Sequence, residues 1–175
     1  MIKKLLAIDL TPCDIVAREL GHPHFPVQAM RELIAGDGVD LIETLVTLVE
    51  RVADDTPESI AANKVNFTRI RHALEEAGAR VIPAPAKRQP DGTFKQSDDQ
   101  RLVIATLSAA LRLRPDFVVL AAADGDFAPM VWALRDAGIR TEILARPQML
   151  ASDLRRAAYS VIDLDTALNQ IGGHH

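Results

Sequence analysis

Two aspartates, Asp124 and Asp126, stand two residues apart directly after the apolar run Phe117–Ala123. The run is short and contains no polar residue, which is typical of a strand buried on both faces. Two carboxylates on one turn repel each other, and a divalent cation would relieve that repulsion because hard cations prefer oxygen ligands. Alternatively, Asp126 caps a helix and Asp124 is a solvated turn residue. The pair alone leaves both interpretations open.

Further aspartates stand at the ends of other predicted elements. Asp9 closes the first apolar run, at Leu5–Leu10, and Asp99 lies in the first turn of a helix predicted over residues 97–113, with Ser97 as its cap and Gln100 three residues on. If the strands are parallel neighbours, their carboxyl ends meet at one edge, where open α/β folds bind ligands. We therefore predict that one site is formed by Asp9, Asp99, Asp124 and Asp126, with Asp98 and Thr11 as accessory residues.

A group of three or four carboxylates would bind one or two Mg²⁺ or Mn²⁺ ions. The group contains no histidine, and oxygen-only ligands favour these ions over Zn²⁺. Such ions polarise a phosphoryl oxygen and lower the pKa of a bound water, which is the chemistry of phosphodiester hydrolysis. Nearby cations could hold a phosphate backbone against the site. The cations that could do so are Lys87, Arg88, Lys95 and Arg101.

The elements that must position these residues alternate along the chain. Strands are predicted at residues 5–10, 79–83, 117–123, 139–144 and 160–164, and helices at 15–20, 27–34, 41–52, 56–77, 97–113, 128–137, 150–158 and 166–171. A helix is preferred to a strand within residues 41–52 because Glu43, Glu50 and Arg51 suit a helix face. Residues 84–96 are interpreted as a loop. This alternation predicts an α/β fold with a mostly parallel central sheet and helices on both faces.

Composition narrows the class of protein. The length of 175 residues predicts one domain, residues 1–171, in which residues 20–60 form a helical insertion or divergent segment and residues 172–175 a tail. The net charge of -4 excludes a global cationic field, and an aromatic content of 4% argues against binding single strands through stacked aromatics. The single cysteine fits a reducing compartment, and no apolar stretch could span a membrane. A cytoplasmic location is expected.

The acidic turn resembles a known family motif. The run Val118–Val131, followed by Leu134-Arg135 and Ala137-Gly138, is similar to the NYN domain in the LabA-like branch of the PIN-like nucleases. The segment Lys95–Leu102 resembles the family's second motif, with Asp99 on the family aspartate and Asp98 as the alternative. The resemblance implies a three-layer α/β/α, PIN-like fold and a metal-dependent endoribonuclease acting on an RNA substrate.

Two positions depart from the family pattern. Pro12 stands where the family usually has an asparagine, and Ala105 where it often has a further aspartate. These departures favour an alternative, a catalytically weakened or inactive PIN-like module that binds RNA or a protein partner. Residues 20–60 leave two roles open, a homodimer surface or a substrate cover.

Two other families fit less well. A TOPRIM-like phosphotransfer domain also places a D-x-D motif after a strand, but it needs a glutamate after an early strand, where this chain has Asp9. A receiver-like domain would use Asp9 or Asp124 as phosphoacceptor. Such a domain has a lysine after a late strand, and this chain has none in the expected place.

Overall fold

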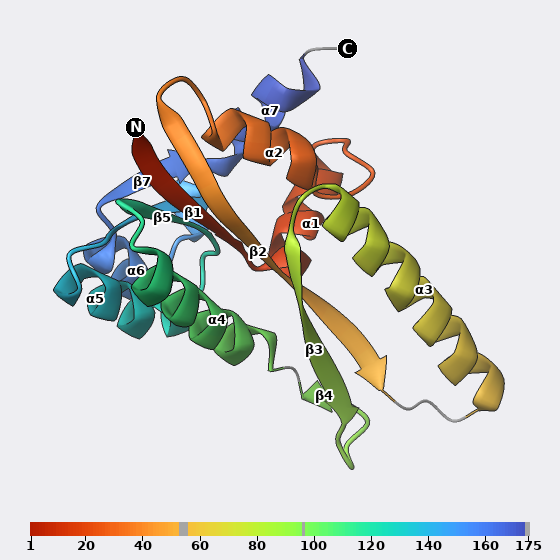
Figure 1. Ribbon diagram of the computed structural model, residues 1–175. Helices are drawn as coiled ribbons and strands as arrows, with labels where there is room; N and C mark the ends of the chain where they lie inside the picture. The colour runs from red at the N-terminus through yellow and green to blue at the C-terminus, as the bar shows by residue number, and fades with distance from the viewer. Residues whose placement is uncertain (53–55, 96, 174–175) are drawn as a thin grey trace.

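A seven-stranded sheet forms the centre of the part of the chain that the structure describes (Figure 1). The structure is a computed structural model describing residues 1–52, 56–95 and 97–173, with the backbone alone for Val52, Lys87, Arg88, Phe94 and Lys95. The strand order is β4-β3-β2-β1-β5-β6-β7, all parallel except β4, which runs antiparallel to β3. The strands are β1 (Ile2–Ile8), β2 (Val39–Val52), β3 (Arg80–Arg88), β4 (Phe94–Lys95), β5 (Phe117–Ala121), β6 (Arg140–Ala145) and β7 (Ser160–Asp163).

Helices cover both faces of this sheet. One face packs against α4 (Asp98–Leu113), α5 (Ala128–Asp136) and α6 (Ser152–Ala157). The other packs against α1 (Leu10–Glu19), α2 (Val27–Ile34), α7 (Leu164–Gly172) and the last turns of α3 (Pro57–Glu76). Two short 3₁₀ turns, η1 (Gly125–Phe127) and η2 (Pro147–Met149), follow β5 and β6. The predicted three-layer α/β/α fold with a mostly parallel sheet is confirmed.

The apolar run of β1 packs against the helices on both faces of the sheet. Successive side chains of a strand point to opposite faces. Accordingly Leu5 and Ala7 lie in the core beneath α4–α6, while Leu6 and Ile8 lie in the core beneath α1, α2 and α7. All four side chains are fully buried. A strand in this central position needs apolar residues on both faces, so its carboxyl end is fixed firmly beside its neighbours.

The helix predicted for residues 41–52 is wrong, because this segment is the strand β2. Before Leu45, β2 pairs with β1 alone. Leu45 and Val46 pair with both β1 and β3 and are buried on opposite faces. Beyond Val46, β2 no longer pairs with β1 and continues beside β3 alone. Charged residues at this outer end, such as Glu50 and Arg51, are only partly covered, which mimics the pattern of a helix face.

The loop predicted for residues 84–96 is also largely wrong. The strand β3 continues to Arg88 and turns into β4, with Lys87 paired to Lys95 and Arg88 to Phe94. Figure 1 shows this hairpin, the end of β2 and the first turns of α3 extending away from the rest of the sheet. Three of the four predicted cations therefore belong to strands, Lys87 and Arg88 to β3 and Lys95 to β4.

Two helix starts differ from the sequence prediction. The helix α1 begins at Leu10 rather than Ile15, and Pro12 is accommodated in its first turn, where a proline removes no helical hydrogen bond. Asp14 lies within this helix and accepts a hydrogen bond of 2.9 Å from the Phe25 N–H. Ser97 precedes α4 without capping it, and its hydroxyl accepts a bond of 3.2 Å from Arg101 Nε.

The predicted tail and the hydropathy of the helices can also be compared with the structure. The helix α7 ends at Gly172, one residue into the predicted tail, and residues 174–175 lie outside the described part. None of the described helices combines the length and the apolar character needed to cross a membrane.

Candidate metal centre

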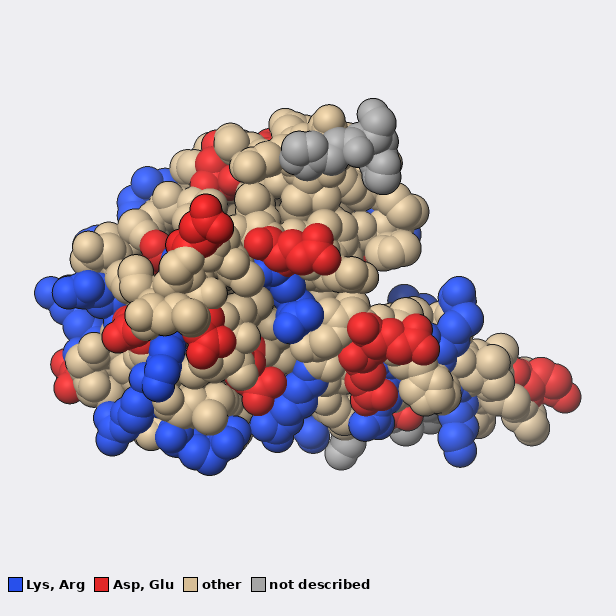
Figure 2. All heavy atoms as spheres, turned by 45° about the horizontal axis from the view of Figure 1, so that its top comes forward, with Lys and Arg blue, Asp and Glu red and all other residues tan. Residues whose placement is uncertain are grey.

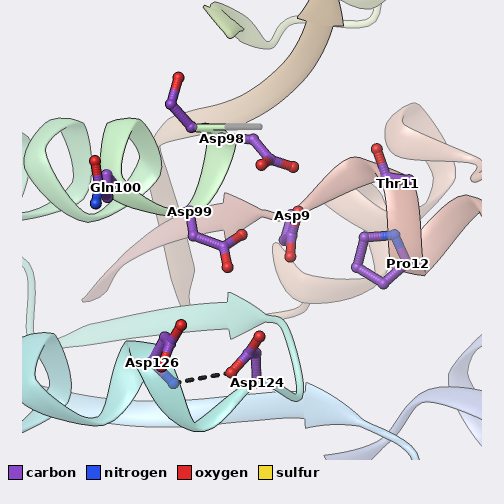
Figure 3. Close-up of a pocket in the computed structure, with 9 residues that line it drawn as sticks. Asp9, Thr11, Pro12, Asp98, Asp99, Gln100, Asp124 and Asp126 are labelled. Atoms are coloured by element: carbon purple, nitrogen blue, oxygen red, sulfur yellow. Dashed lines mark hydrogen bonds between the residues drawn. The ribbon is translucent and has the colours of Figure 1, made fainter. Parts of the chain in front are cut away.

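A hollow of about 360 Å³ lies at the carboxyl edge of the sheet, and five aspartates line it (Figure 3). The parallel register places Ile8 of β1 opposite Ala121 of β5, so the residues that follow these two strands emerge side by side. Asp9 follows β1 directly, and the turn after β5 carries two more carboxylates. The first turn of α4 supplies the last two. The five aspartates are Asp9, Asp98, Asp99, Asp124 and Asp126.

Asp9 does not have the structural role that its position would allow. It stands at the amino end of α1, but its side chain makes no capping hydrogen bond. Only 5% of the residue is exposed, and its Oδ1 has no hydrogen-bond partner among the described residues. A buried polar atom is normally hydrogen-bonded, because leaving it without a partner costs free energy. An orphaned carboxylate oxygen therefore points to a ligand.

The carboxylates form two overlapping groups of three. One oxygen from each of Asp9, Asp98 and Asp99 lies within 4.8 Å of the other two. A second group, with the same spacing, joins Asp99 to Asp124 and Asp126. Figure 3 shows the side chains of Asp9, Asp98 and Asp99 pointing toward one another, with Asp124 and Asp126 on the adjacent turn. Asp99 is common to both groups and so occupies the centre of the cluster.

Burial and mutual repulsion change the protonation of this cluster. Burial, with the nearby charges of Asp99, Asp98 and Asp124, raises the pKa of Asp9 to about 7. Burial also raises the pKa of Asp99 to about 6, together with the charges of Asp98, Asp124 and Asp126. Both causes disfavour the ionised form. Without a counter-ion, the folded chain therefore holds these two carboxylates under electrostatic strain.

The chemistry of these residues fits a divalent cation. Every charged residue lining the hollow is an aspartate, so no lysine or arginine neutralises the cluster from its described lining. Carboxylate oxygens without histidine or cysteine favour Mg²⁺ or Mn²⁺. The orphaned Oδ1 of Asp9 supplies a buried oxygen without another use. One cation could be held by Asp9, Asp98 and Asp99, and a second by Asp99, Asp124 and Asp126.

The alternative interpretation of the acidic turn made Asp126 a helix cap and Asp124 a solvated turn residue. In the structure Asp124 is the capping residue. Asp124 Oδ1 accepts a hydrogen bond of 3.0 Å from the Asp126 N–H, so Asp124 caps η1. The following helix α5 begins after Phe127, and Asp126 does not cap it. One oxygen of Asp124 is thereby used structurally, and this bond fixes the orientation of the carboxylate toward the hollow.

Of the other predicted site residues, Thr11 lies at the hollow and Arg101 lies outside its lining. Thr11 lines the hollow beside Pro12, as Figure 3 shows. Arg101 lies on the exposed surface of α4, and its guanidinium donates to Ser97 Oγ and, over 3.3 Å, to the Pro83 carbonyl. The side chains of Lys87, Arg88 and Lys95 lie outside the described residues. Arg101 is thus the one predicted RNA-contacting residue whose side chain is described, and it is not part of the lining.

Thr47 is a residue that the sequence did not indicate. Its hydroxyl accepts a hydrogen bond of 3.2 Å from the Leu10 N–H and donates one of 3.4 Å to the Ile8 carbonyl. These two groups belong to the residues on either side of Asp9. The Asp9 N–H itself donates to the Ala121 carbonyl over 3.0 Å. Thr47 and β5 together therefore fix the backbone that presents Asp9. No signal identified Thr47, because its segment was predicted to be helical.

Replacing the Thr47 hydroxyl should weaken cation binding. A Thr47→Val variant keeps the shape of a side chain that is 2% exposed, but leaves the Leu10 N–H without its partner. Groups that orient a metal ligand typically change metal affinity by about 10- to 100-fold. We expect Thr47→Val to raise the Mn²⁺ dissociation constant by at least about tenfold, as measured by titration calorimetry.

Two variants control for a general effect on folding. Thr47→Ser retains the hydroxyl and should restore most of the Mn²⁺ affinity. Thr106→Val removes a fully buried hydroxyl that has no described partner, on the helix α4, and should leave that affinity unchanged. Equal Mn²⁺ affinity in Thr47→Val and the wild type would show that Thr47 does not position Asp9.

Comparisons with known proteins agree with this architecture. The sequence matches the model of the NYN domain over residues 6–165. None of the curated proteins compared with the sequence matches it. A solved protein of unknown function from Vibrio parahaemolyticus RIMD 2210633 is similar in fold, with a TM-score of 0.68, 19% identity and coverage of 94% of each chain. MurG of Acinetobacter baumannii gives a TM-score of 0.49 at 14% identity, over 92% of this chain and 41% of MurG, which is too low to support an argument.

Proposed function

The chain belongs to the NYN domain family, and from that premise we propose that it is a divalent-metal-dependent endoribonuclease. Membership supports a PIN-like nuclease in general terms. The finer proposal is that the chain belongs to the LabA-like branch, forms one domain over residues 1–171 and acts on RNA in the cytoplasm. The observation that carries it is the buried, unpartnered Oδ1 of Asp9 within the group formed with Asp98 and Asp99.

The chain's own residues account for how a substrate would be positioned. Five carboxylates repel an RNA phosphate, so the phosphate can approach the hollow only when bound cations neutralise them. When bound, Mg²⁺ or Mn²⁺ would polarise a phosphoryl oxygen and lower the pKa of the attacking water. Asp99 links the two carboxylate groups and so fixes their relative position. The exposed guanidinium of Arg101 carries positive charge on the first turns of α4, next to the hollow.

A second candidate is a module that has lost catalysis and binds RNA or a protein partner. The observation favouring it is Pro12, which lines the hollow where the family usually has an asparagine. A proline ring offers neither a side-chain donor nor an acceptor, so one potential ligand or substrate contact is missing. Such a module would have this fold and these carboxylates but would bind cations weakly.

Calorimetric titration with Mn²⁺ tests the proposal and separates the two candidates. We expect the wild type to bind one or two Mn²⁺ ions below millimolar concentration. Because Asp99 belongs to both carboxylate groups, Asp99→Asn should weaken binding by at least about tenfold. Asp37→Asn, at an exposed position before β2, is the control and should bind as the wild type does. Absence of Mn²⁺ binding at millimolar concentration would favour the binding module.

A further inference from the structure

A second hollow, of about 440 Å³, lies near the amino end of β6, whereas the aspartates lie at the carboxyl ends of the strands. Its walls come from the end of α5, the start of β6 and the end of α6, and we call it the α5–α6 groove. Aliphatic side chains, among them Val131 and Ala157, form its interior. Polar and aromatic groups, Arg135, Arg140 and Tyr159, surround it. The sequence had not indicated this surface.

Guanidinium groups lie over aromatic rings at this groove. The Arg140 guanidinium carbon is 5.2 Å from the centre of the Tyr159 ring and 5.6 Å from that of Phe117. The two rings are 5.7 Å apart in an edge-to-face arrangement. On α5, the Arg135 guanidinium carbon lies 5.3 Å from the Trp132 ring. Each pair is within the range of a cation–π interaction, so the planar groups are held in place before any ligand arrives.

Two exposed aromatic side chains lie in or beside the groove. The chain has one tryptophan and one tyrosine: Tyr159, 62% exposed, lines the groove, and Trp132, 44% exposed, follows Val131 of the lining along α5. Base stacking needs only a few exposed rings in the right place, so an overall aromatic content of 4% does not exclude it. Composition alone therefore does not exclude stacking at this one surface.

Polar groups at the groove have unused binding capacity. Neither Arg135 nor Arg140 forms an ion pair with a carboxylate among the described residues. Thr141 lines the groove, is 2% exposed, and its hydroxyl has no hydrogen-bond partner within the described part of the chain. Figure 2 shows Lys and Arg side chains gathered on the left of the molecule, where α5 and α6 lie. Cations beside exposed rings suit a ligand that combines negative charge with a planar ring system.

We propose that the α5–α6 groove binds a nucleotide of single-stranded RNA that flanks the cleavage position, which rests on the proposed ribonuclease function. The base stacks on Tyr159, and the adjacent phosphate contacts Arg135 and Arg140. The helix α5 connects the two sites, because it starts just after Asp124 and Asp126 and ends beside the groove. Its nine residues span about 13 Å, so an RNA strand lying along α5 contacts both sites.

Fluorescence of Trp132 reports on the groove, because this ring lies beside Arg135 of the lining and the chain has no other tryptophan. The wild-type protein is titrated with a single-stranded oligouridylate of about twelve nucleotides in excess EDTA, which prevents metal-dependent cleavage. We expect saturable quenching of Trp132. Tyr159→Ala and Arg135→Gln should each raise the dissociation constant by about five- to tenfold. Arg18→Gln is the matched control on the other face of the sheet and should bind as the wild type does.

The outcomes separate this proposal from the function it rests on. Quenching that depends on Tyr159 and Arg135, in a chain that does not cleave RNA with Mn²⁺, would support the groove and refute the hydrolase. RNA cleavage without quenching, or with equal affinity in all four proteins, would overturn the groove alone. Concentration-dependent dimerisation in sedimentation experiments that is lost in Tyr159→Ala would also overturn it, because the groove would then receive a second copy of the chain.

Discussion

An Asp124→Asn variant is expected to cleave single-stranded RNA at least about 100-fold more slowly than the wild type in Mn²⁺. Asparagine keeps an Oδ1 that can accept the hydrogen bond from the Asp126 N–H, so the cap of η1 survives. The substitution removes one negative charge from the carboxylate group that includes Asp99. Metal ions contribute several kcal/mol to phosphoryl-transfer catalysis, and each 1.4 kcal/mol corresponds to about a tenfold change in rate.

Asp163→Asn provides a closely matched control for this experiment. Asp163 stands at a strand end too, as the last residue of β7, and its Oδ1 accepts hydrogen bonds from backbone N–H groups at the start of α7. It does not line the aspartate hollow. This variant should cleave RNA at the wild-type rate, measured by gel analysis of a labelled oligonucleotide with and without EDTA. Equal rates in Asp124→Asn and the wild type, from preparations free of contaminating nuclease, would refute the ribonuclease proposal.

The Asp9→Asn substitution is expected to change stability in opposite directions with and without metal. In EDTA at pH 8, wild-type Asp9 must be ionised although its pKa in the folded chain is about 7. The shift from 3.8 corresponds to at most about 4 kcal/mol of destabilisation. Asparagine removes that charge, so the variant should unfold at a higher temperature than the wild type. Part of the gain will be lost, because the new amide is also buried without a partner.

Saturating Mn²⁺ should reverse this order. A ligand at about 100 times its dissociation constant stabilises the folded state by about 3 kcal/mol, or roughly 6–12 °C in a chain of this size. Asp9→Asn removes a proposed ligand and should gain much less. Thermal denaturation of both proteins, in EDTA and in Mn²⁺, measures all four values. A variant that gains as much from Mn²⁺ as the wild type would show that Asp9 does not bind the cation.

The pH dependence in EDTA follows from the same raised pKa. The folded protein holds a proton on Asp9 more tightly than the unfolded chain does, so protonation favours folding. This contribution is complete below about pH 4 and is lost as the pH rises through about 7. The difference in stability between Asp9→Asn and the wild type should therefore shrink as the pH falls from 8 to 5. Asp99, with a pKa of about 6, also destabilises the folded state as the pH rises, and it does so in both proteins.

The amino-acid sequence alone determined the layers of the fold and most of the acidic cluster. Short apolar runs such as Leu5–Ile8 and Val118–Ala121 specify strands buried on both faces, because only a central parallel strand covers apolar residues on two sides. The aspartates that follow those runs must then emerge at one edge of the sheet. Local periodicity failed in the segment 41–52, where β2 projects beyond its neighbour β1 and carries charged residues at its outer end.

Only the tertiary structure decided what these aspartates experience. The burial of Asp98, the orphaned oxygen of Asp9 and the two hydrogen bonds of Thr47 depend on the packing of β1, β2, β5 and α4, which are distant in sequence. The α5–α6 groove is of the same kind, because Arg135, Arg140 and Tyr159 come to line one hollow only when α5, β6 and the residues after α6 pack together. Burial and contact depend on how two elements pack against each other. The spacing of residues along the sequence predicts each helix or strand but not this packing.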